Sequence, residues 1–339
     1  MINSSSLTDK HSVRFRSLAL LTVVTIYLLV LAGGIVRGTG SGMGCPDWPK
    51  CFGRWVPPTE VSQLPPNYQQ VYGAKLKGEV EFNAVKTWIE YINRLLGAFS
   101  GFLVLATLVA SLPYLRKDRL VFWGTFLALL LILANAWLGS RVVATELAQY
   151  MITFHLLLAI LLVFSLLFVL VRSGAVKQPA LHSDQNGKKL NSFLLLLLAV
   201  SFAQIVLGTQ VRDGLNEVVK RIGYDQREQW ISELDWRFYV HRSFSLVVLA
   251  LHIGFIYQLK KSFNDGVMRQ LTTGLITLVV AEIVTGIVMA YFAVPAAAQP
   301  AHLFLAVLMM GLQFTIWLLL HPALSSPKRI VDTTRLQKI

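Results

Sequence analysis

Charged residues are scarce in this chain. Aspartate, glutamate, lysine and arginine together make up 14% of its 339 residues, whereas hydrophobic residues make up 55%, and the mean hydropathy is +0.57. A water-soluble domain needs more charge to coat its surface, so the composition excludes that class. We therefore predict an all-α integral membrane protein that has the lipid bilayer as its solvent.

Acidic residues are the scarcer charged kind, 18 against 31 basic residues, which gives a formal net charge of +13. Such an excess can indicate a nucleic-acid partner, but here the basic residues recur in groups between apolar stretches. By the positive-inside rule they mark the cytoplasmic side, which predicts a multi-pass protein of the inner (cytoplasmic) membrane with both termini inside and no nucleic-acid partner. The groups are Lys10, Arg14 and Arg16; Arg116, Lys117 and Arg119; Lys188 and Lys189; Lys260 and Lys261; and Lys328 and Arg329.

Cysteine is nearly absent. Cys45 and Cys51 are the two in the chain, and both fall in the first predicted outer loop. On that oxidising side they can form a disulfide, either as a structural staple for a long loop or as a redox-active pair near a cofactor. Two cysteines alone do not make a zinc site.

Eight transmembrane helices account for the long uncharged stretches. One stretch, from Gln270 to Pro327, is interrupted only by Glu282 and is long enough for two helices, with the break supplied by the prolines of Ala293-Val-Pro-Ala-Ala-Ala-Gln-Pro300. The first stretch lacks an A-x-A-like cleavage site, so we expect an uncleaved helix. The other six stretches lie within 16–37, 94–116, 119–141, 146–172, 189–212 and 242–260.

An internal repeat divides the chain into two related halves. Asn93-Arg94 matches His241-Arg242, and His155 matches His302 at nearly the same separation. We therefore predict two pseudo-symmetric four-helix bundles. The predicted boundaries are 1–172 for the first half with its outer loop at 37–87, 173–190 for a cytoplasmic linker, and 191–339 for the second half.

A polar residue four positions before a glycine recurs in three of the predicted helices: Asn135 to Gly139, Gln204 to Gly208 and Glu282 to Gly286. Small residues at such positions let helices approach closely. Glu282 is the one acid near mid-membrane, where it either handles protons or makes an interhelical hydrogen bond as a neutral acid.

Three of the seven histidines, His155, His241 and His302, lie near the outer ends of predicted helices. A single histidine in a bundle is usually a helix-to-helix hydrogen bonder. Three at repeat-related positions favour haem, with His241 and His302 as the two axial ligands of one iron. His252 lies too deep to share that iron, and we expect His11, His182 and His321 to be solvated.

The first half differs chemically, because Asn93 stands where the second half has His241, and Glu90 where it has Phe238. Glu90 can point toward whatever His155 holds, or it can be an interfacial acid paired with Lys86 or Arg94. Five arginines lie at outer helix ends, where they can contact haem propionates or anchor at headgroups. They are Arg37, Arg94, Arg141, Arg212 and Arg242.

These residues resemble the haem A synthases over about 18–320. Four stretches carry the resemblance: Gly33-Gly-Ile-Val-Arg-Gly-Thr-Gly-Ser-Gly-Met-Gly-Cys-Pro-Asp-Trp-Pro-Lys-Cys51, Glu90-Tyr-Ile-Asn-Arg94, His155-Leu-Leu-Leu-Ala159, and His241-Arg242 with His302. The resemblance implies haem b held by the second-half histidines, and substrate haem held in the first half beside a functional glutamate. It further implies oxidation of a methyl group of haem O to the formyl group of haem A, for haem-copper terminal oxidases and alongside a haem O synthase.

Under this interpretation Glu90 is catalytic, and His155 and Asn93 bind the substrate haem, with His155 on its iron. The chain departs from the family pattern at Asn93, where members usually have histidine, and a carboxamide is a poor iron ligand. Two other interpretations are a b-type membrane cytochrome that only transfers electrons, and a chaperone that carries haem O. The electron acceptor and any homo-oligomer are left open.

Overall fold

The computed structural model describes residues 4–73, 81–145, 147–179 and 185–326. This part of the chain is helical and contains eight helices that are long and apolar enough to cross a membrane, as predicted. His182, Lys328 and Arg329 lie outside the described residues, as do parts of the predicted outer loop and linker. The eight helices are α1 (Ser4–Gly38), α3 (Ala84–Ser111), α5 (Arg119–Ala144), α6 (Gln149–Arg172), α7 (Gln185–Ile222), α8 (Trp236–Ser262), α9 (Gly266–Tyr291) and α10 (Ala298–Leu319).

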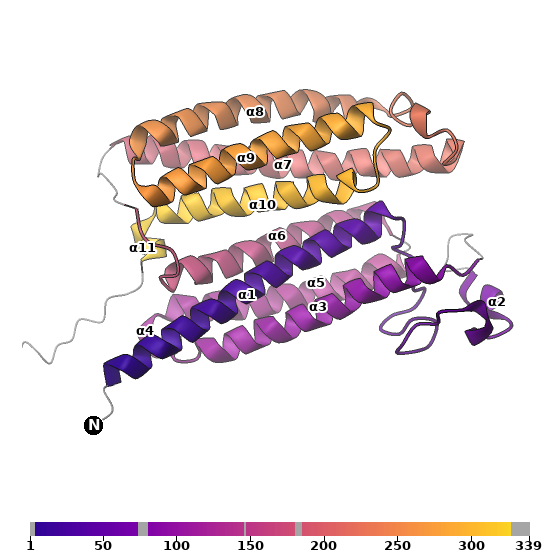
Figure 1. Cartoon of the computed structure of the whole chain (residues 1–339), viewed down its shortest axis with the longest axis horizontal. Helices are drawn as coiled ribbons and strands as arrows, with labels where there is room; N and C mark the ends of the chain where they lie inside the picture. Colours follow the sequence, from indigo (N-terminus) through magenta and orange to yellow (C-terminus); the bar gives the residue numbers. More distant parts are fainter. Residues whose placement is uncertain (1–3, 74–80, 146, 180–184, 327–339) are drawn as a thin grey trace, which may run out of the picture.

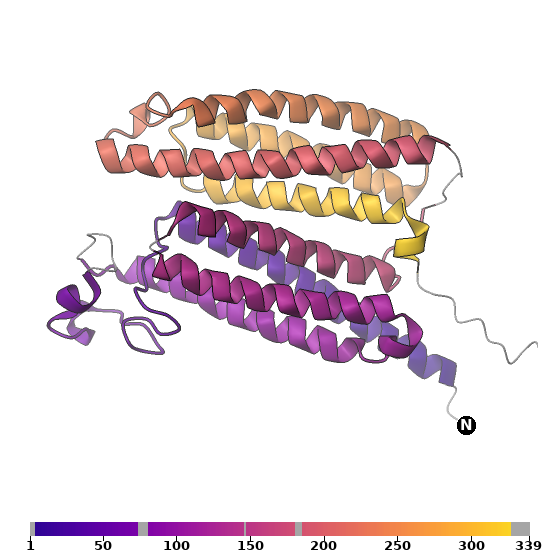
Figure 2. The ribbon, with the colours of Figure 1, turned by 180° about the vertical axis from the view of Figure 1, so that it is seen from behind.

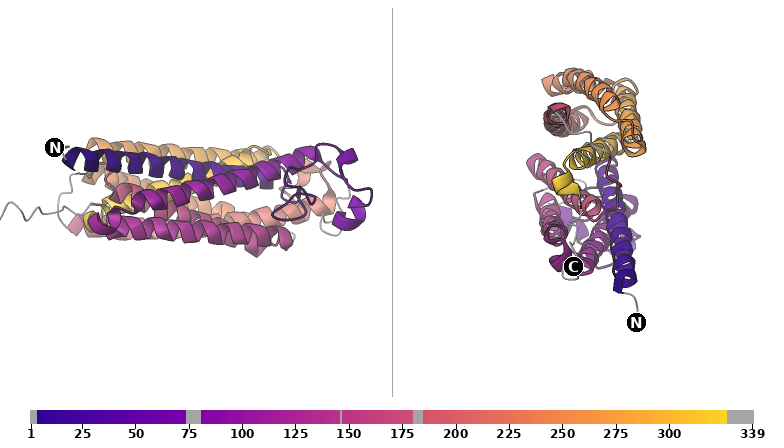
Figure 3. Two further views of the ribbon diagram at one scale, coloured as in Figure 1. Left: turned by 90° about the horizontal axis from the view of Figure 1, so that it is seen from below. Right: turned by 90° about the vertical axis from the view of Figure 1, so that its left-hand side faces the viewer.

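Two layers of four helices make up the molecule (Figure 1). Helices α1, α3, α5 and α6 form one bundle and α7 to α10 form the other, and the view from behind shows the same division (Figure 2). The pairs α1–α3, α3–α5, α5–α6 and α1–α6 are in contact, and α7–α8, α8–α9, α9–α10 and α7–α10 repeat this order. Helix α10 packs on α1 and α6, so the two bundles meet mainly through it (Figure 3).

Short elements cover the ends of the bundles. The first outer loop carries η1 (Val61–Gln63) and α2 (Tyr68–Gly73), and η2 (Arg227–Gln229) lies between α7 and α8. At the opposite end lie α4 (Tyr114–Lys117) and α11 (Pro322–Ser325) (Figure 1).

Side-chain caps fix where several helices begin, because the first backbone N–H groups of a helix have no partner within it. Asn83 accepts from the N–H of Lys86 at 3.0 Å and so starts α3 well before the apolar stretch. Glu90 and Arg94 are therefore helical residues. Asp235 caps α8 and Asp265 caps α9 in the same way.

Helix α7 is longer than predicted. The uncharged stretch that predicts this helix ends at Arg212, whereas α7 continues to Ile222. Leu215 and Val218 on this extension pack against Trp230 and Leu234 of the following segment. An apolar contact that the chain makes only after folding back thus extends the helix beyond its uncharged stretch.

The break between α9 and α10 falls where the prolines place it, with Pro295 in the turn and Pro300 in the first turn of α10. Ala293 and Val294 adopt left-handed φ values of 51° and 50°, which is unusual for a β-branched residue. Arg227 donates to the carbonyls of both residues, at 2.7 and 2.6 Å. The turn is therefore held by an arginine from the other outer segment of the same half.

A buried ion pair ties the two bundles together at the end that holds α4 and α11. The Nε of Arg172 in α6 lies 2.8 Å from Asp118, which caps α5. The same guanidinium donates to the carbonyls of Ala323 and Leu324 in α11, at 3.0 and 2.6 Å. Helix α11 directly follows α10, so this contact joins the first half to the second.

Candidate functional site

The two second-half histidines lie on the second and fourth helices of one bundle. His241 lies in the first turns of α8 and His302 in the first turns of α10. Their role as the two ligands of one iron stays a prediction. The Nδ1 atom of His241 is buried and has no hydrogen-bond partner among the described residues. Buried polar atoms are normally paired, so an unpaired imidazole nitrogen identifies a position available to a ligand.

Four glycines face the four repeat-related positions. A Cβ atom at Gly208 would lie 3.2 Å from Cε1 of His241, and one at Gly286 would lie 3.7 Å from Cε1 of His302. In the first half, a Cβ at Gly139 would lie 3.5 Å from Cε1 of His155. The fourth glycine, Gly33, faces Oδ1 of Asn93 at 4.0 Å. The glycines thus make room for imidazole or amide side chains from the next helix.

The polar residues before these glycines contact the histidines. Gln204 in α7 donates to the carbonyl of His241 at 3.1 Å. Glu282 in α9 places Oε2 2.9 Å from Nδ1 of His302. The interhelical bond expected for Glu282 is therefore present, and its partner is a site histidine. The sequence held a signal for this contact, because Glu282 and His302 occupy the repeat positions of Asn135 and His155.

The contacts of the first-half histidine follow the same plan. With its amide orientation assigned from the surrounding donors and acceptors, the side-chain nitrogen of Asn135 in α5 donates to Nδ1 of His155 at 3.1 Å and to its carbonyl at 2.9 Å. The amide oxygen accepts from the N–H of Ala159 at 3.0 Å. Asn93 faces the same interior from α3, and its buried Oδ1 has no partner among the described residues.

Glu90 lies in α3 and is 4% exposed. Its Oε1 pairs with Nη2 of Arg94 at 2.5 Å, and its Oε2 accepts from the N–H of Cys45 at 2.8 Å. The pairing with Arg94 is the one expected of an interfacial acid. No hydrogen bond or ion pair among the described residues joins Glu90 to His155. Its two polar contacts there face the outer loop and its own helix.

The first outer loop is locked onto the start of α3. Cys45 and Cys51 form a disulfide and pack with Phe52, Leu64 and Tyr68 in a small core of their own. This pairing agrees with the disulfide expected from the sequence.

Gly44 holds the same loop close to the helix. Thr87 in α3 donates to the carbonyl of Gly44 at 2.9 Å. A Cβ at Gly44 would lie 2.5 Å from the carbonyl oxygen of Lys86, so only glycine permits this approach.

Arg94 organises that loop. Besides Glu90, it donates to the carbonyls of Asp47 at 2.7 Å, Lys50 at 3.0 Å and Cys45 at 3.0 Å. Its two terminal nitrogens therefore bond to protein acceptors. Sequence reasoning named Arg94 as a propionate contact and missed these carbonyls, because backbone acceptors leave no residue-type signal.

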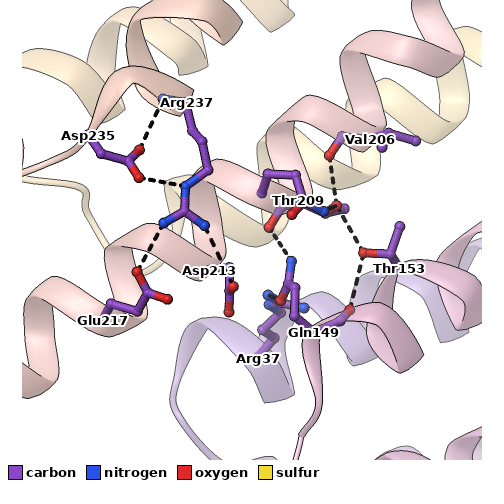
Figure 4. Close-up of polar contacts among 10 residues, drawn as sticks. Arg37, Gln149, Thr153, Val206, Thr209, Asp213, Glu217, Asp235 and Arg237 are labelled. Atoms are coloured by element: carbon purple, nitrogen blue, oxygen red, sulfur yellow. Dashed lines mark hydrogen bonds and ion pairs between the residues drawn. The ribbon is translucent and has the colours of Figure 1, made fainter.

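Arg37 and Arg212 lie where the two halves meet. Figure 4 shows Arg37 beside Gln149. Arg37 donates to Gln149 of α6 at 3.0 Å, and Gln149 donates to the carbonyl of Thr209 in α7 at 2.5 Å. Arg212 donates to the carbonyl of Arg37 at 3.1 Å. The Nε atoms of both arginines are buried and unpaired among the described residues. Each guanidinium therefore keeps one donor for another acceptor.

Two further arginines of the second half lie at its outer end. Arg242 donates to the hydroxyl of Tyr291 at 3.3 Å. Arg237 is surrounded by acids, with Asp235 at 2.7 Å and Glu217 at 2.9 Å (Figure 4).

His252 lies deeper in the second half and is 1% exposed. Its Nδ1 lies 2.7 Å from the carbonyl of Val248, and its Nε2 lies 2.8 Å from the amide nitrogen of Gln313. Gln313 also donates to Ser201 at 3.1 Å. Both ring nitrogens of His252 are therefore occupied by protein, which agrees with its exclusion as an iron ligand.

Comparisons with known proteins indicate the family of this chain. A family model described as COX15-CtaA, cytochrome oxidase assembly protein, matches residues 16–314. Proteins named "Heme A synthase" from Shewanella oneidensis and Bartonella bacilliformis are 31% identical over 56% of this chain and 27% identical over 54% of it. Each of these two matches spans about half of the relative's own length, 54% in both.

A longer match supports the same grouping. A protein from Brucella ovis, also named "Heme A synthase", is 24% identical over 91% of this chain and 92% of its own length. The family match covers all eight membrane-spanning helices, apart from residues 4–15 of α1 and the last residues of α10, and every histidine of the site. The chain therefore belongs to the COX15-CtaA family of cytochrome oxidase assembly proteins.

Proposed function

We propose that this chain is a haem A synthase, an oxidoreductase that converts a methyl group of haem O to the formyl group of haem A for terminal oxidase assembly. Family membership and relatives named for this activity support the proposal. The main observation in its favour is that the two halves have different side chains at equivalent positions. His241 and His302 form a pair, whereas His155 is matched by Asn93 and lies in the half that carries Glu90.

The residues of the second half fit a resident haem b. Two imidazoles are a donor set that suits haem iron, and Nδ1 of His241 has no hydrogen-bond partner among the described residues. Gly208 and Gly286 leave room beside both rings. When bound there, haem supplies one-electron chemistry. His241 and His302 would hold it, and Glu282 would orient His302 through the contact to its Nδ1.

The first half would take haem O as its substrate and release haem A as its product. His155 would bind the iron, and Asn93 would face it with a weakly coordinating oxygen. Such a site is labile, which suits exchange of substrate for product. Glu90 would accept a proton released from the methyl group as it is oxidised, since its carboxylate is buried and fixed by Arg94 and Cys45.

Arginines at the outer end would bind the haem propionates. Arg37 and Arg212 each retain a buried, unpaired Nε–H, and Arg242 is bonded only to a tyrosine hydroxyl in the described part of the chain. Charge-assisted bonds from arginine to carboxylate are stronger than neutral ones. Arg94 would contribute only if it gave up a loop carbonyl.

The proposed setting is the inner membrane of the cell, with the termini inside and the disulfide loop outside. A haem O synthase would supply the substrate, and assembly of a haem-copper oxidase would consume the product. The orientation predicts that Cys45 and Cys51 resist a membrane-impermeant maleimide until they are reduced, and are then labelled from outside. Labelling that requires permeabilised membranes would contradict it.

The decisive experiment is pigment extraction from cells that express this chain beside a haem O synthase. Haem A is expected in the extract, and cells with the synthase alone are the control. The second candidate, a b-type cytochrome that only transfers electrons, is favoured by the paired histidines of the second half. It predicts a low-spin spectrum without haem A.

A further inference from the structure

Helix α1 of the first half packs closely against helix α10, which carries His302 of the second half. A Cβ atom at Gly34 of α1 would lie 3.2 Å from Cβ and 3.3 Å from Cα of Pro300. One at Gly38 would lie 3.2 Å from Cδ of the same proline and 3.2 Å from the carbonyl oxygen of Ala296. Small residues let membrane helices approach each other this closely. The first turn of α10 therefore lies directly against two glycines of the first half.

A second contact between the same two helices lies deeper in the membrane-spanning region. The ring of Tyr27 in α1 meets the ring of Phe304 in α10 edge-on, with the ring centroids 6.3 Å apart. Gly311 in α10 leaves room for the hydroxyl group of Tyr27, because a Cβ atom there would collide with that oxygen. In the first contact the glycines belong to α1 and the ring to α10, and here the glycine belongs to α10. The two surfaces are therefore complementary in shape.

These contacts lie on the face of α10 opposite to His302. Pro300, Phe304 and Gly311 are separated by four and seven residues, so they share one side of the helix. His302 lies midway between Pro300 and Phe304 in sequence, which places it about 180° from their common direction. Its ring faces Gly286 of α9, inside the second half. A movement of α10 away from α1 therefore carries His302 toward the interior of the second half.

The equivalent contact behind His155 has different chemistry. The repeat places Thr209 of α7 at the position of Gly34 in α1. It places Thr153 of α6 at the position of Pro300 in α10. The two threonine hydroxyl oxygens lie 3.1 Å apart (Figure 4). A hydroxyl group can rotate to form other hydrogen bonds, whereas a proline ring packed on a glycine backbone has no such freedom. The more rigid contact is therefore the one behind the second-half histidine.

We propose that Tyr27, Gly34 and Gly38 of the first half are positioning residues that fix His302 as a haem ligand of the second half. They act through α10, because they set how far this helix lies from α1. A ligand geometry must be held within about 0.5 Å to be effective, so the close packing of two helices can decide it. Resting on the proposed function, this arrangement makes haem retention by the second half depend on a helix of the first half.

The first test adds one methyl group behind His302. In Gly34→Ala the new Cβ is too close to Pro300, so the start of α10 must shift by a few tenths of an ångström. The low-spin haem of the full-length protein should pass to an excess of a haem-scavenging apoprotein about tenfold faster than in wild type, because overpacking strains the neighbouring backbone. Gly101→Ala in α3 is the matched control, since a Cβ atom there meets nothing within 4 Å.

Electron paramagnetic resonance of the ferric low-spin haem distinguishes positioning from overall stability. The signal depends on the axial ligands and their orientation, so it should shift in Gly34→Ala and stay unchanged in Gly101→Ala. A general loss of stability would lower the amount of folded protein without shifting the signal. A Gly34→Ala protein that matches Gly101→Ala in both the rate of haem loss and the signal would overturn the proposal.

The second test removes packing instead of adding it, and it decides the matter if Gly34→Ala does not fold. Tyr27→Ala deletes the ring that contacts Phe304 and leaves a cavity behind α10. Haem loss should again be about tenfold faster, because a cavity lets the neighbouring helix shift. Tyr27→Phe keeps the ring and should stay near the wild-type rate. Equal rates of haem loss in Tyr27→Ala and Tyr27→Phe would contradict the positioning role of Tyr27.

The readouts separate this inference from the proposed function, since haem loss and the resonance signal do not depend on whether haem O is oxidised. A wild-type protein that holds a low-spin haem but forms no haem A would contradict the proposed oxidation alone. A wild-type protein without a low-spin haem would contradict the second-half haem site and this inference with it. Haem A formation together with a low-spin haem that neither variant affects would contradict only this inference.

Discussion

The two halves share one helix arrangement, yet their interiors differ in polarity. Below the site, the second half contains the buried polar group His252, Gln313 and Ser201. The repeat counterparts in the first half are Val104, Leu166 and Ile26, which lie together in one apolar cluster. All three equivalent positions are polar in one half and apolar in the other. We infer that this helix arrangement can pack around either kind of interior when all three residues are of the same kind.

At the site itself, the first half carries the more varied polar side chains. The second half pairs two imidazoles, whereas the first half has one imidazole, one amide, and an acid that anchors the outer loop. The half with the long disulfide loop is therefore the half without a full set of iron ligands. We infer that the second half is built to retain a haem and the first half to admit one.

The largest effects are expected from histidine substitutions, which should distinguish the role of one half from that of the other. His241→Ala or His302→Ala should eliminate the low-spin haem spectrum, because each removes one axial ligand. His155→Ala should leave that spectrum intact and abolish haem A formation. The spectra are compared in membranes containing equal amounts of each variant. Loss of the low-spin signal in His155→Ala would contradict the assignment of the low-spin haem to the second half.

The next largest effect is expected at Glu90, which has Phe238 as its counterpart. Glu90→Gln keeps the shape of the side chain and one acceptor, for Arg94 or for the N–H of Cys45, but cannot take up a proton. If Glu90 is the base, haem A yield should fall by about a hundredfold, the usual contribution of a general base. Yield is measured by pigment extraction, with the low-spin spectrum as a control. An unchanged yield would reduce Glu90 to an anchor of the outer loop.

Asn93→His makes the halves alike. Because Gly33 leaves space beside Asn93 as Gly208 does beside His241, an imidazole should fit there. A second low-spin component is expected when haem is loaded into the first half, and Asn93→Ala is the matched control without one. Two bis-histidine signals of equal strength in the wild-type protein would mean that another histidine already supplies the missing ligand.

The smallest effect is expected in the deep polar group. His252→Val introduces the counterpart residue of the first half and should cost about 1–2 kcal/mol, since buried hydrogen bonds between membrane helices contribute little. Thermal unfolding in detergent measures this loss, and the triple variant with Gln313→Leu and Ser201→Ile should recover part of it. Haem A yield should not change. A lost low-spin spectrum in a folded His252→Val protein would assign this histidine to the haem site.

Much of the fold was predictable from hydropathy. Six uncharged stretches and one longer stretch divided by prolines predicted eight helices, because backbone groups in a bilayer must bond within their own segment. Helix ends were less predictable. The cap at Asn83 and the packing of Leu215 on Trp230 moved the limits of α3 and α7, and the second of these depends on chain segments that meet only in the folded protein.

The sequence by itself determined which residue types stand at the four repeat-related positions: Asn93, His155, His241 and His302. It did so because a duplicated unit keeps its spacing. Only the tertiary structure decided what each polar neighbour does. Glu282 contacts His302, Asn135 contacts His155, and Arg94 bonds to loop carbonyls rather than facing the interior. Hydrogen bonds depend on distance and direction between separate helices, and a sequence specifies neither until those helices pack.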